Sequence, residues 1–182
     1  MVIPCFGENP ATRSKAFREF THYVRDLHVG GFVVLNRVVG GSARNAEPHA
    51  MASFLNRMQR LSAIPLIVAS DFERGASMRV ASTARFPHLM AYGAAHDLQL
   101  TRRLGAATAR EARALGVHWV FAPDADVNNN PDNPIINTRS FGEDPLAVAG
   151  HVSAFIAGAH SDSTHRVLVT AKHFPGHGDT SV

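Results

Sequence analysis

The chain alternates between short, continuous apolar runs and longer stretches in which apolar residues recur every three or four positions. Continuous apolar runs of about four to eight residues are typical of strands that are buried on both faces. We expect such strands at residues 2–6, 32–36, 65–70, 117–123 and 166–171. The stretches with helical spacing predict amphipathic helices over residues 14–28, 48–62, 97–116 and 145–161.

The order of these segments is strand and helix in strict alternation, which predicts an α/β fold with a parallel sheet. Residue-level signals agree with the helix ends: Asp97 stands where an N-cap is expected and Gly116 where a helix would stop. Two architectures fit such a pattern, a TIM-type (β/α)8 barrel and an open, doubly wound sheet. Only about five βα units are present, so a barrel would be an incomplete N-terminal portion, and residues 1–182 form one partial domain without a second one.

Polar residues follow four successive predicted strands, at the point where each apolar run stops. In parallel α/β folds ligands bind at the carboxyl ends of the strands, so polar residues there are candidates for a site. The residues in question are Asn36, Asp71, Glu73, Asp124, Asp126, Lys172 and His173. Four strands with the same terminal chemistry favour a functional site at this edge of the sheet.

Composition and charge exclude several classes of protein. Apolar residues make up 45% of the 182 residues and charged residues 18%, which is typical of a folded domain, and no apolar run is long enough for a membrane span. The net charge is +3, but the arginines are scattered along helix faces, so we expect no nucleic-acid partner. Cys5 is the single cysteine, which excludes an internal disulfide and favours a small buried residue in a strand.

The candidate residues mix fixed donors with acceptors, as a ligand rich in hydroxyl groups requires, because each hydroxyl both donates and accepts. The set is Asp71, Arg79, Arg139, Lys172 and His173. Lys172 is one of only two lysines beside sixteen arginines, which suggests chemistry that needs a compact ammonium group. Arg139, in an irregular loop, could donate to a ligand or form an ion pair with Glu143 or Asp144.

Other ligands fit the sequence less well. No glycine-rich phosphate-binding motif is present. The spacing from His173 to His177 and Asp179 could suggest a metal site, but Pro175 and its flanking glycines exclude the helix that would bring the two histidines onto one face. We therefore expect neither a metal ion nor another cofactor.

Five segments together resemble the catalytic barrel domain of glycoside hydrolase family three, and most of all its bacterial β-N-acetylglucosaminidase branch. The segment KHFPGHGDT is the most specific of them. The segments are residues 28–36, 71–79, 109–127, 138–145 and 172–180. The resemblance implies a TIM-like barrel that hydrolyses β-glycosidic bonds with retention of configuration, and a carbohydrate substrate.

The resemblance also implies roles for the five candidates in binding the sugar. Asp71 corresponds to the aspartate that accepts hydrogen bonds from sugar hydroxyls, and Arg79 to an arginine near the same sugar. Arg139 corresponds to the arginine of the R-S-F-G segment, while Lys172 and His173 correspond to the lysine–histidine pair that holds hydroxyls.

The chain departs from the commoner family pattern D-Q-E-G-G-R-V, which puts the shape of that loop and the choice of substrate in question. The departures are Phe72, Arg74, Ala76 and Ser77.

The resemblance places the two reacting groups, a nucleophilic aspartate and an acid/base histidine in a D-S-H stretch, after Val182. We therefore expect no catalytic residue within these 182 residues, and no hydrolysis by them alone. Two alternatives stay open: a β-glucosidase or other exo-glycosidase of the same family, and a non-catalytic carbohydrate-binding protein on the same scaffold. The N-terminus shows no signal peptide, which favours the cytoplasm, although a truncated start would hide one.

Overall fold

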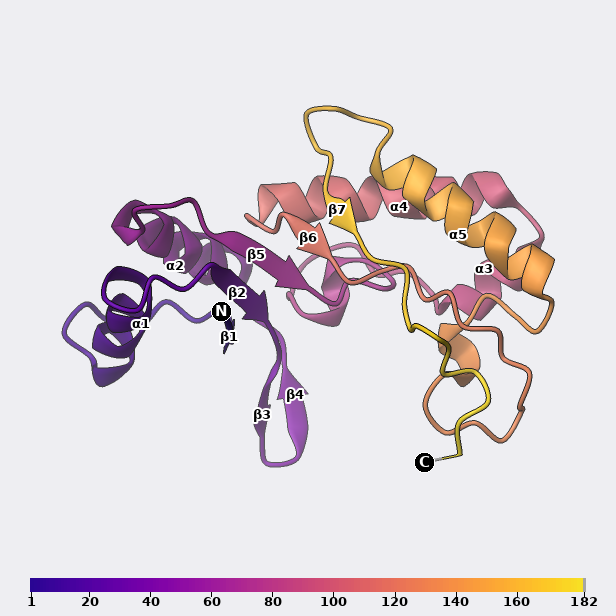
Figure 1. Ribbon diagram of the computed structural model, residues 1–182, viewed down its shortest axis with the longest axis horizontal. Helices are drawn as coiled ribbons and strands as arrows, with labels where there is room; N and C mark the ends of the chain where they lie inside the picture. The colour runs from indigo at the N-terminus through magenta and orange to yellow at the C-terminus, as the bar shows by residue number, and fades with distance from the viewer. Residues whose placement is uncertain (182) are drawn as a thin grey trace.

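A five-stranded parallel sheet runs through the middle of the computed structural model, which describes residues 1–181 (Figure 1). Its strands are β1 (Val2–Cys5), β2 (Gly31–Val34), β5 (Ile67–Ser70), β6 (Trp119–Val120) and β7 (Leu168–Val169). The strands stand side by side in chain order, and each neighbouring pair is parallel. All five predicted strands are therefore confirmed, although β6 and β7 are shorter than their apolar runs.

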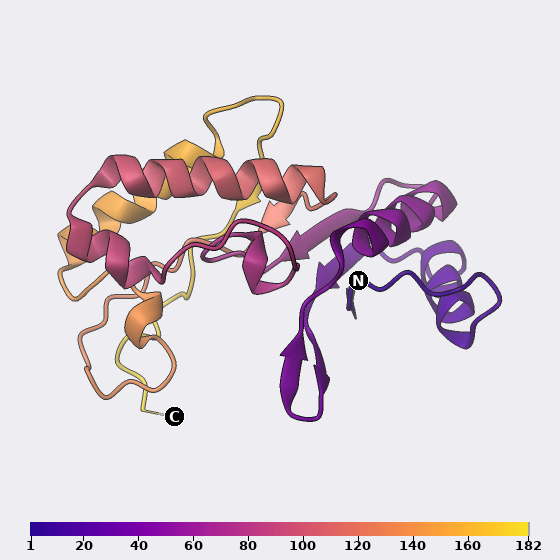
Figure 2. The ribbon, with the colours of Figure 1, turned by 180° about the vertical axis from the view of Figure 1, so that it is seen from behind.

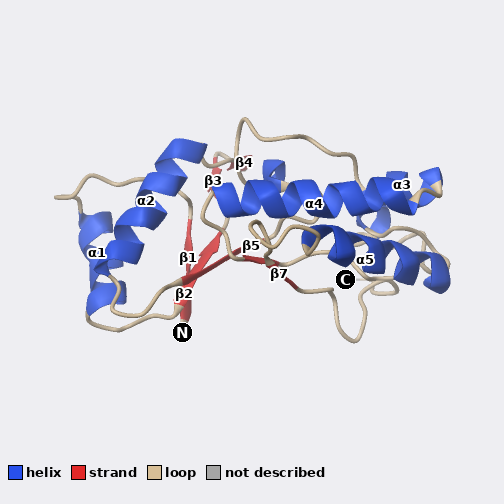
Figure 3. Cartoon of the chain, turned by 90° about the horizontal axis from the view of Figure 1, so that it is seen from above, coloured by secondary structure: helices blue, strands red, loops and turns tan. Residues whose placement is uncertain are grey.

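Helices connect the strands and lie along the sheet (Figures 2 and 3). They are α1 (Lys15–Arg25), α2 (Pro48–Leu61), α3 (Leu89–Ala95), α4 (Leu98–Ala114) and α5 (Pro145–Ala159). Side chains cap four of them: Ser14, Glu47, Asp97 and Asp144 each accept a hydrogen bond from a backbone N–H in the first turn. Within residues 1–181, no helix is both long enough and apolar enough to span a membrane.

The strand order decides between the two predicted architectures. A doubly wound sheet reverses its strand order at a switch point. The order here runs from β1 to β7 without reversal, as in a barrel, so the predicted incomplete TIM-type fold is confirmed. Among the described residues, β1 pairs only with β2 and β7 only with β6, which leaves this portion of the sheet open.

Several elements carry no clear signal in the sequence. A hairpin of β3 (Arg37–Val39) and β4 (Ser42–Arg44) extends from the end of β2, and its turn uses Gly40 and Gly41 at positive φ (Figure 1). Both strands are exposed, so no burial pattern marks them. The short helix α3 and two 3₁₀ turns, η1 (Ala76–Met78) and η2 (Asn137–Arg139), were also not predicted.

The hydrophobic core holds the sheet against its helices. Phe20 of α1 meets Phe32 of β2 and Phe54 of α2 edge to face, with ring centroids 5.7 and 4.9 Å apart. Cys5 is buried in β1, as predicted. At the end of β5, Phe72 is fully buried in the core, and the residues on either side of it face the opposite way. This alternation places Asp71 and Glu73 together above the carboxyl end of the sheet.

Candidate functional site

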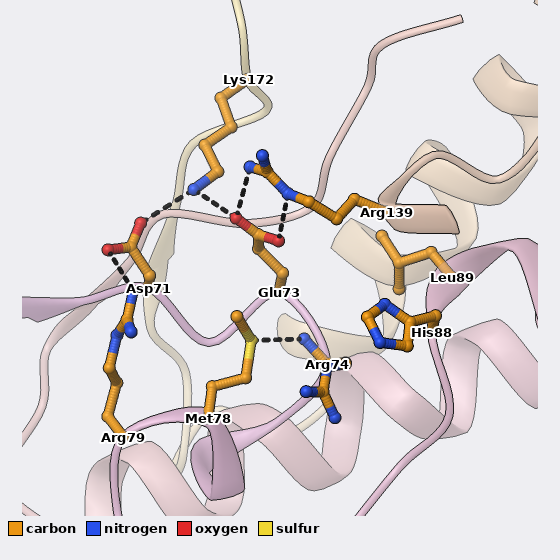
Figure 4. Close-up of a pocket in the computed structure, with 9 residues that line it drawn as sticks. All are labelled: Asp71, Glu73, Arg74, Met78, Arg79, His88, Leu89, Arg139 and Lys172. Atoms are coloured by element: carbon orange, nitrogen blue, oxygen red, sulfur yellow. Dashed lines mark hydrogen bonds and ion pairs between the residues drawn. The ribbon is translucent and has the colours of Figure 1, made fainter. Parts of the chain in front are cut away.

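The polar residues that follow the strands meet at the carboxyl end of the sheet, around a cavity of about 370 Å³ (Figure 4). Segments far apart in the chain contribute to it: the loops that follow β5 and β7, the 3₁₀ turns η1 and η2, and the start of α3. The lining residues are Asp71, Glu73, Arg74, Met78, Arg79, His88, Leu89, Arg139 and Lys172. Four of the five predicted site residues are among them.

Lys172 lies between two carboxylates. Its Nζ is 2.8 Å from Oδ1 of Asp71 and 2.7 Å from Oε1 of Glu73 (Figure 4). A parallel bridge between Asp124 and Lys172 sets the backbone of this strand end beside its neighbour. The ammonium group is thereby held as a fixed donor with little exposure to solvent, as its side chain is 15% exposed.

Arg79 ties Asp71 to the neighbouring strand end. Its Nη2 donates to Oδ2 of Asp71 at 3.1 Å, and its Nη1 donates to the side-chain oxygen of Asn36. Burial would raise the pKa of Asp71, but hydrogen bonds and charge from Lys172 and Arg79 outweigh it and lower that pKa. Asp71 is therefore ionised at neutral pH and remains an acceptor.

Arg139 makes a two-pronged ion pair with Glu73, which is 66 positions away. Its Nε and Nη2 donate to the two carboxylate oxygens at 3.1 and 2.9 Å. The alternative pairing with Glu143 or Asp144 is wrong, because the chain folds Arg139 back over β5 while Asp144 caps α5. Burial raises the pKa of Glu73, but Arg139 and Lys172 together bring it below its usual value.

His173 lies beside this cavity rather than on its lining, and it pairs with the buried Asp126. Its Nδ1 is 2.6 Å from Oδ2 of Asp126, while Oδ1 accepts the backbone N–H of His177 at 2.5 Å. Burial would raise the pKa of Asp126, but hydrogen bonds from Asp124, His173 and His177 lower it. A carboxylate on Nδ1 fixes the tautomer of the ring and leaves Nε2 of His173 for another partner.

Asp124 is fully buried and sits next to Asp126. Its Oδ2 accepts no hydrogen bond within the described part of the chain and lies 3.5 Å from Nη2 of Arg139. Burial first, and then the neighbouring charges of Asp126 and Glu73, raise the pKa of Asp124 to about 8. Asp124 is thus a neutral carboxylic acid at neutral pH, beside an ionised one.

Asp124, Asp126 and His173 are also the one group of described residues with ligand atoms close enough for a metal ion, within 4.8 Å of one another. Both oxygens of Asp126 already accept hydrogen bonds, and the guanidinium of Arg139 faces Asp124. A cation in that place would meet the positive charge of Arg139, so the geometry favours a hydrogen-bonded carboxylate–imidazole pair.

The sequence analysis placed Glu73, Asp124 and Asp126 among the polar candidates at the strand ends but did not include them in the sugar-binding set. Their position after the strands was the available signal. The sequence did not show which groups pair. In the structure Glu73 binds both Lys172 and Arg139, and Asp126 orients His173. His177 contributes through its backbone, because its carbonyl also accepts from the side chain of Asn133 at 2.7 Å.

Residues 7–182 match the family described as the glycosyl hydrolase family 3 N terminal domain. The chain belongs to this family. The resemblance expected from the five sequence segments is therefore confirmed, and so is the fold that it implied.

Relatives of this family 3 domain carry names that agree with the expected branch. A β-N-acetylglucosaminidase/β-glucosidase from Cellulomonas fimi is 34% identical over 161 residues, which are 88% of this chain and 26% of that protein. The β-hexosaminidase A of Pseudoalteromonas piscicida is 33% identical over 178 residues, covering 90% of this chain and 28% of the relative. This chain thus spans between a quarter and a third of the length of both proteins.

Solved structures of two named enzymes superpose on the whole chain or most of it. A family 3 β-N-acetylglucosaminidase from Paenibacillus sp. FPU-7 has a TM-score of 0.81 at 33% identity, with 100% of this chain and 33% of that chain covered. A β-glucoside phosphorylase has a TM-score of 0.74 at 32% identity, covering 84% of this chain and 26% of its own. The nucleophile and acid/base positions that the resemblance places after Val182 lie outside the described residues.

Proposed function

We propose that this chain holds the sugar-binding residues of a glycosidase that removes terminal β-linked N-acetylhexosamine residues from glycoconjugates or peptidoglycan fragments. The observation that carries the proposal is the alternation of fixed acceptors and donors around one cavity, from Asp71 through Lys172 and Glu73 to Arg139. The names of the relatives that match this chain support the same substrate class.

In this proposal Asp71, Lys172 and His173 form hydrogen bonds with the sugar, and the arginines hold the carboxylates in place. Asp71 accepts from one or two hydroxyls, and Lys172, with three N–H donors and two carboxylate partners, donates to another. Arg79 and Arg139 hold the two carboxylates in place and line the same cavity. His173, oriented by Asp126, presents Nε2 to a neighbouring hydroxyl.

These residues orient the sugar, and the reaction itself requires two further groups. A retaining glycosidase uses a nucleophilic carboxylate and an acid/base on opposite sides of the scissile bond. By resemblance to the family, an aspartate and a histidine from outside the described residues fill these roles. Holding the ring by several rigid contacts lowers the entropic cost of bringing it to the nucleophile.

One observation favours a second candidate reaction, transfer of the sugar to inorganic phosphate. The cavity carries more cationic than anionic side chains, which suits an anionic acceptor, and one structural relative is described as a β-glucoside phosphorylase. The nucleophilic carboxylate would first displace the aglycone, whose oxygen leaves with a proton from the acid/base. A phosphate oxygen would then bond to the anomeric carbon as the bond between that carbon and the nucleophile breaks, and the phosphate's proton would restore the acid/base.

Binding of N-acetylglucosamine to the chain, followed by calorimetry or NMR titration, tests the sugar-binding role. Lys172→Met removes the ammonium group at similar volume, and we expect it to weaken binding by at least about tenfold, because it removes charge-assisted hydrogen bonds. Lys15→Met is the matched control, since Lys15 is the other lysine and lies exposed at the start of α1. Equal affinities in the two variants would contradict the proposal.

The products formed by the full gene product distinguish the candidate reactions. With p-nitrophenyl N-acetylglucosaminide we expect faster turnover than with the corresponding glucoside, which separates the hexosaminidase from the β-glucosidase alternative. Free N-acetylglucosamine as product in the presence of phosphate indicates hydrolysis, whereas the sugar 1-phosphate indicates phosphorolysis. Binding without turnover of either glycoside would favour the non-catalytic alternative.

A further inference from the structure

Arg74 differs from the other cations of the cavity because it forms no ion pair with a carboxylate in the described part of the chain. Arg79, Arg139 and Lys172 each form an ion pair with Asp71 or Glu73. Within residues 1–181 the guanidinium of Arg74 makes a single hydrogen bond, from Nη1 to the carbonyl oxygen of Phe86 at 3.5 Å. Most of its donors are therefore available to a ligand.

The side chains that line the cavity carry a net positive charge. Its lining includes four cationic side chains but only two carboxylates, Asp71 and Glu73, both ionised at neutral pH. Asp124, behind Arg139, is protonated and does not offset the surplus. The lining thus carries two uncompensated positive charges, in a concave place that is open to a ligand.

His88 lies beside Arg74 at the side of the cavity away from Lys172 (Figure 4). Removal of water from the ring, and then the positive charge of Arg74, lower the pKa of His88. Its imidazole is therefore neutral at neutral pH and offers one N–H to an acceptor without adding charge. An arginine fork next to a neutral imidazole donor matches two or three oxygens of one anion.

We infer that Arg74 and His88 form an oxyanion subsite that adjoins the sugar-binding residues and takes a phosphate or carboxylate group. The inference rests on the proposed function for its position in the site, and it names the class of substrate or acceptor that the site selects. The anion has two possible sources. It is either free inorganic phosphate that accepts the sugar, or a carboxylate carried by the glycoside itself.

Titration of the chain with inorganic phosphate at constant ionic strength tests the subsite. We expect Arg74→Gln to weaken phosphate binding by about tenfold or more, since one charge-assisted pair is lost. Arg85→Gln is the matched control, because Arg85 is exposed, lies outside the cavity lining and carries the same charge. Thermal unfolding of each variant shows whether it is folded.

A second arm identifies the source of the anion. An N-acetylglucosamine ether that carries a carboxylate is titrated alongside neutral N-acetylglucosamine. A larger effect of Arg74→Gln on phosphate assigns the subsite to a free acceptor, and a larger effect on the carboxylated sugar assigns it to the glycoside. Equal affinities of Arg74→Gln and Arg85→Gln for both anions would overturn the inference.

A measurement on the unmodified chain keeps the inference testable if Arg74→Gln does not fold. Phosphate should shift the imidazole NMR signals of His88, assigned with His88→Asn, and leave unchanged those of His165, which is partly exposed and lies outside the cavity lining. Unshifted His88 signals at saturating phosphate would overturn the subsite. Failure of neutral N-acetylglucosamine to bind, with the phosphate response intact, would instead refute the proposed sugar-binding function and leave the subsite standing.

Discussion

At the scale of single residues, the site depends on buried polar groups that have defined partners. Asp126 and Asp124 follow the same strand and are both buried, yet one is ionised and the other neutral. Burial raises the pKa of both groups. Asp126 offsets it by accepting from His173 and from a backbone N–H, while Oδ2 of Asp124 accepts no hydrogen bond in residues 1–181. Partner geometry, more than residue type, sets the chemistry of each carboxyl group.

The Asp126–His173 pair leads to a prediction about orientation. Asp126→Asn should leave the ring of His173 without its carboxylate and weaken N-acetylglucosamine binding several-fold. The ¹⁵N shifts of the His173 ring should show a changed tautomer mixture, which a general loss of packing would not produce. Asp162→Asn removes the carboxylate of an exposed Asp–His pair with a similar distance, 2.8 Å, and serves as the control. An unchanged His173 tautomer in Asp126→Asn would refute this role.

At the scale of secondary-structure elements, the loops after the strands are held in place by close backbone contacts. Gly178 lies so near the carbonyl oxygen of Val127 that a Cβ atom would meet it at 1.7 Å. This contact brings the loop after β7 against the loop after β6, where His177 reaches Asp126. Helices α4 and α5 approach each other in the same way, through Gly105 and Gly158.

The two helices provide a matched pair of glycine substitutions. Gly158→Ala would place a Cβ 1.9 Å from the carbonyl oxygen of Arg102, so we expect a loss of roughly 1–3 kcal/mol or more in the free energy of unfolding. Gly150→Ala, in the same helix, meets only Leu98 side-chain atoms at 3.7 Å or more, and helix propensity should stabilise it by roughly 0.5–1 kcal/mol. Urea unfolding measures both, and similar values would contradict the close packing of α4 on α5.

At the scale of the whole molecule, the buried Asp124 couples global stability to pH. The folded pKa of about 8 is far above the usual 3.8, so the native state holds a proton that the unfolded chain has lost. This coupling makes the free energy of unfolding fall as pH rises from about 4 to about 8, by at most about 1.4 kcal/mol per pH unit, and the fall stops above that range.

Asp124→Asn should remove this contribution. Between pH 5 and pH 8 we expect the wild-type chain to lose stability relative to the variant, with the difference becoming constant above pH 8. Other titrating groups act on both proteins, so the difference between their urea unfolding curves reports on Asp124. Parallel pH profiles for the two proteins would show that Asp124 is already ionised in the native state.

The sequence by itself determined the elements and their order. Continuous apolar runs and helical stripes are local patterns, and they predicted five strands and four helices. The polar residues at strand ends followed from the same local reading, since carboxyl ends of parallel strands must share one edge. Exposed elements such as the β3–β4 hairpin bury little apolar surface, so their sequences show no hydrophobic periodicity from which they could be predicted.

Only the tertiary structure decided which groups pair. Arg139 has two carboxylates within five positions in the chain, yet it binds Glu73, which is 66 positions away, because the loop before α5 folds over the end of β5. Lys172 and Asp71 meet across 101 positions for the same reason. Those pairings leave Arg74 without a carboxylate partner among residues 1–181, and the cavity lining therefore carries a surplus of positive charge. Charge pairing depends on distance in space, which the local pattern of a sequence does not contain.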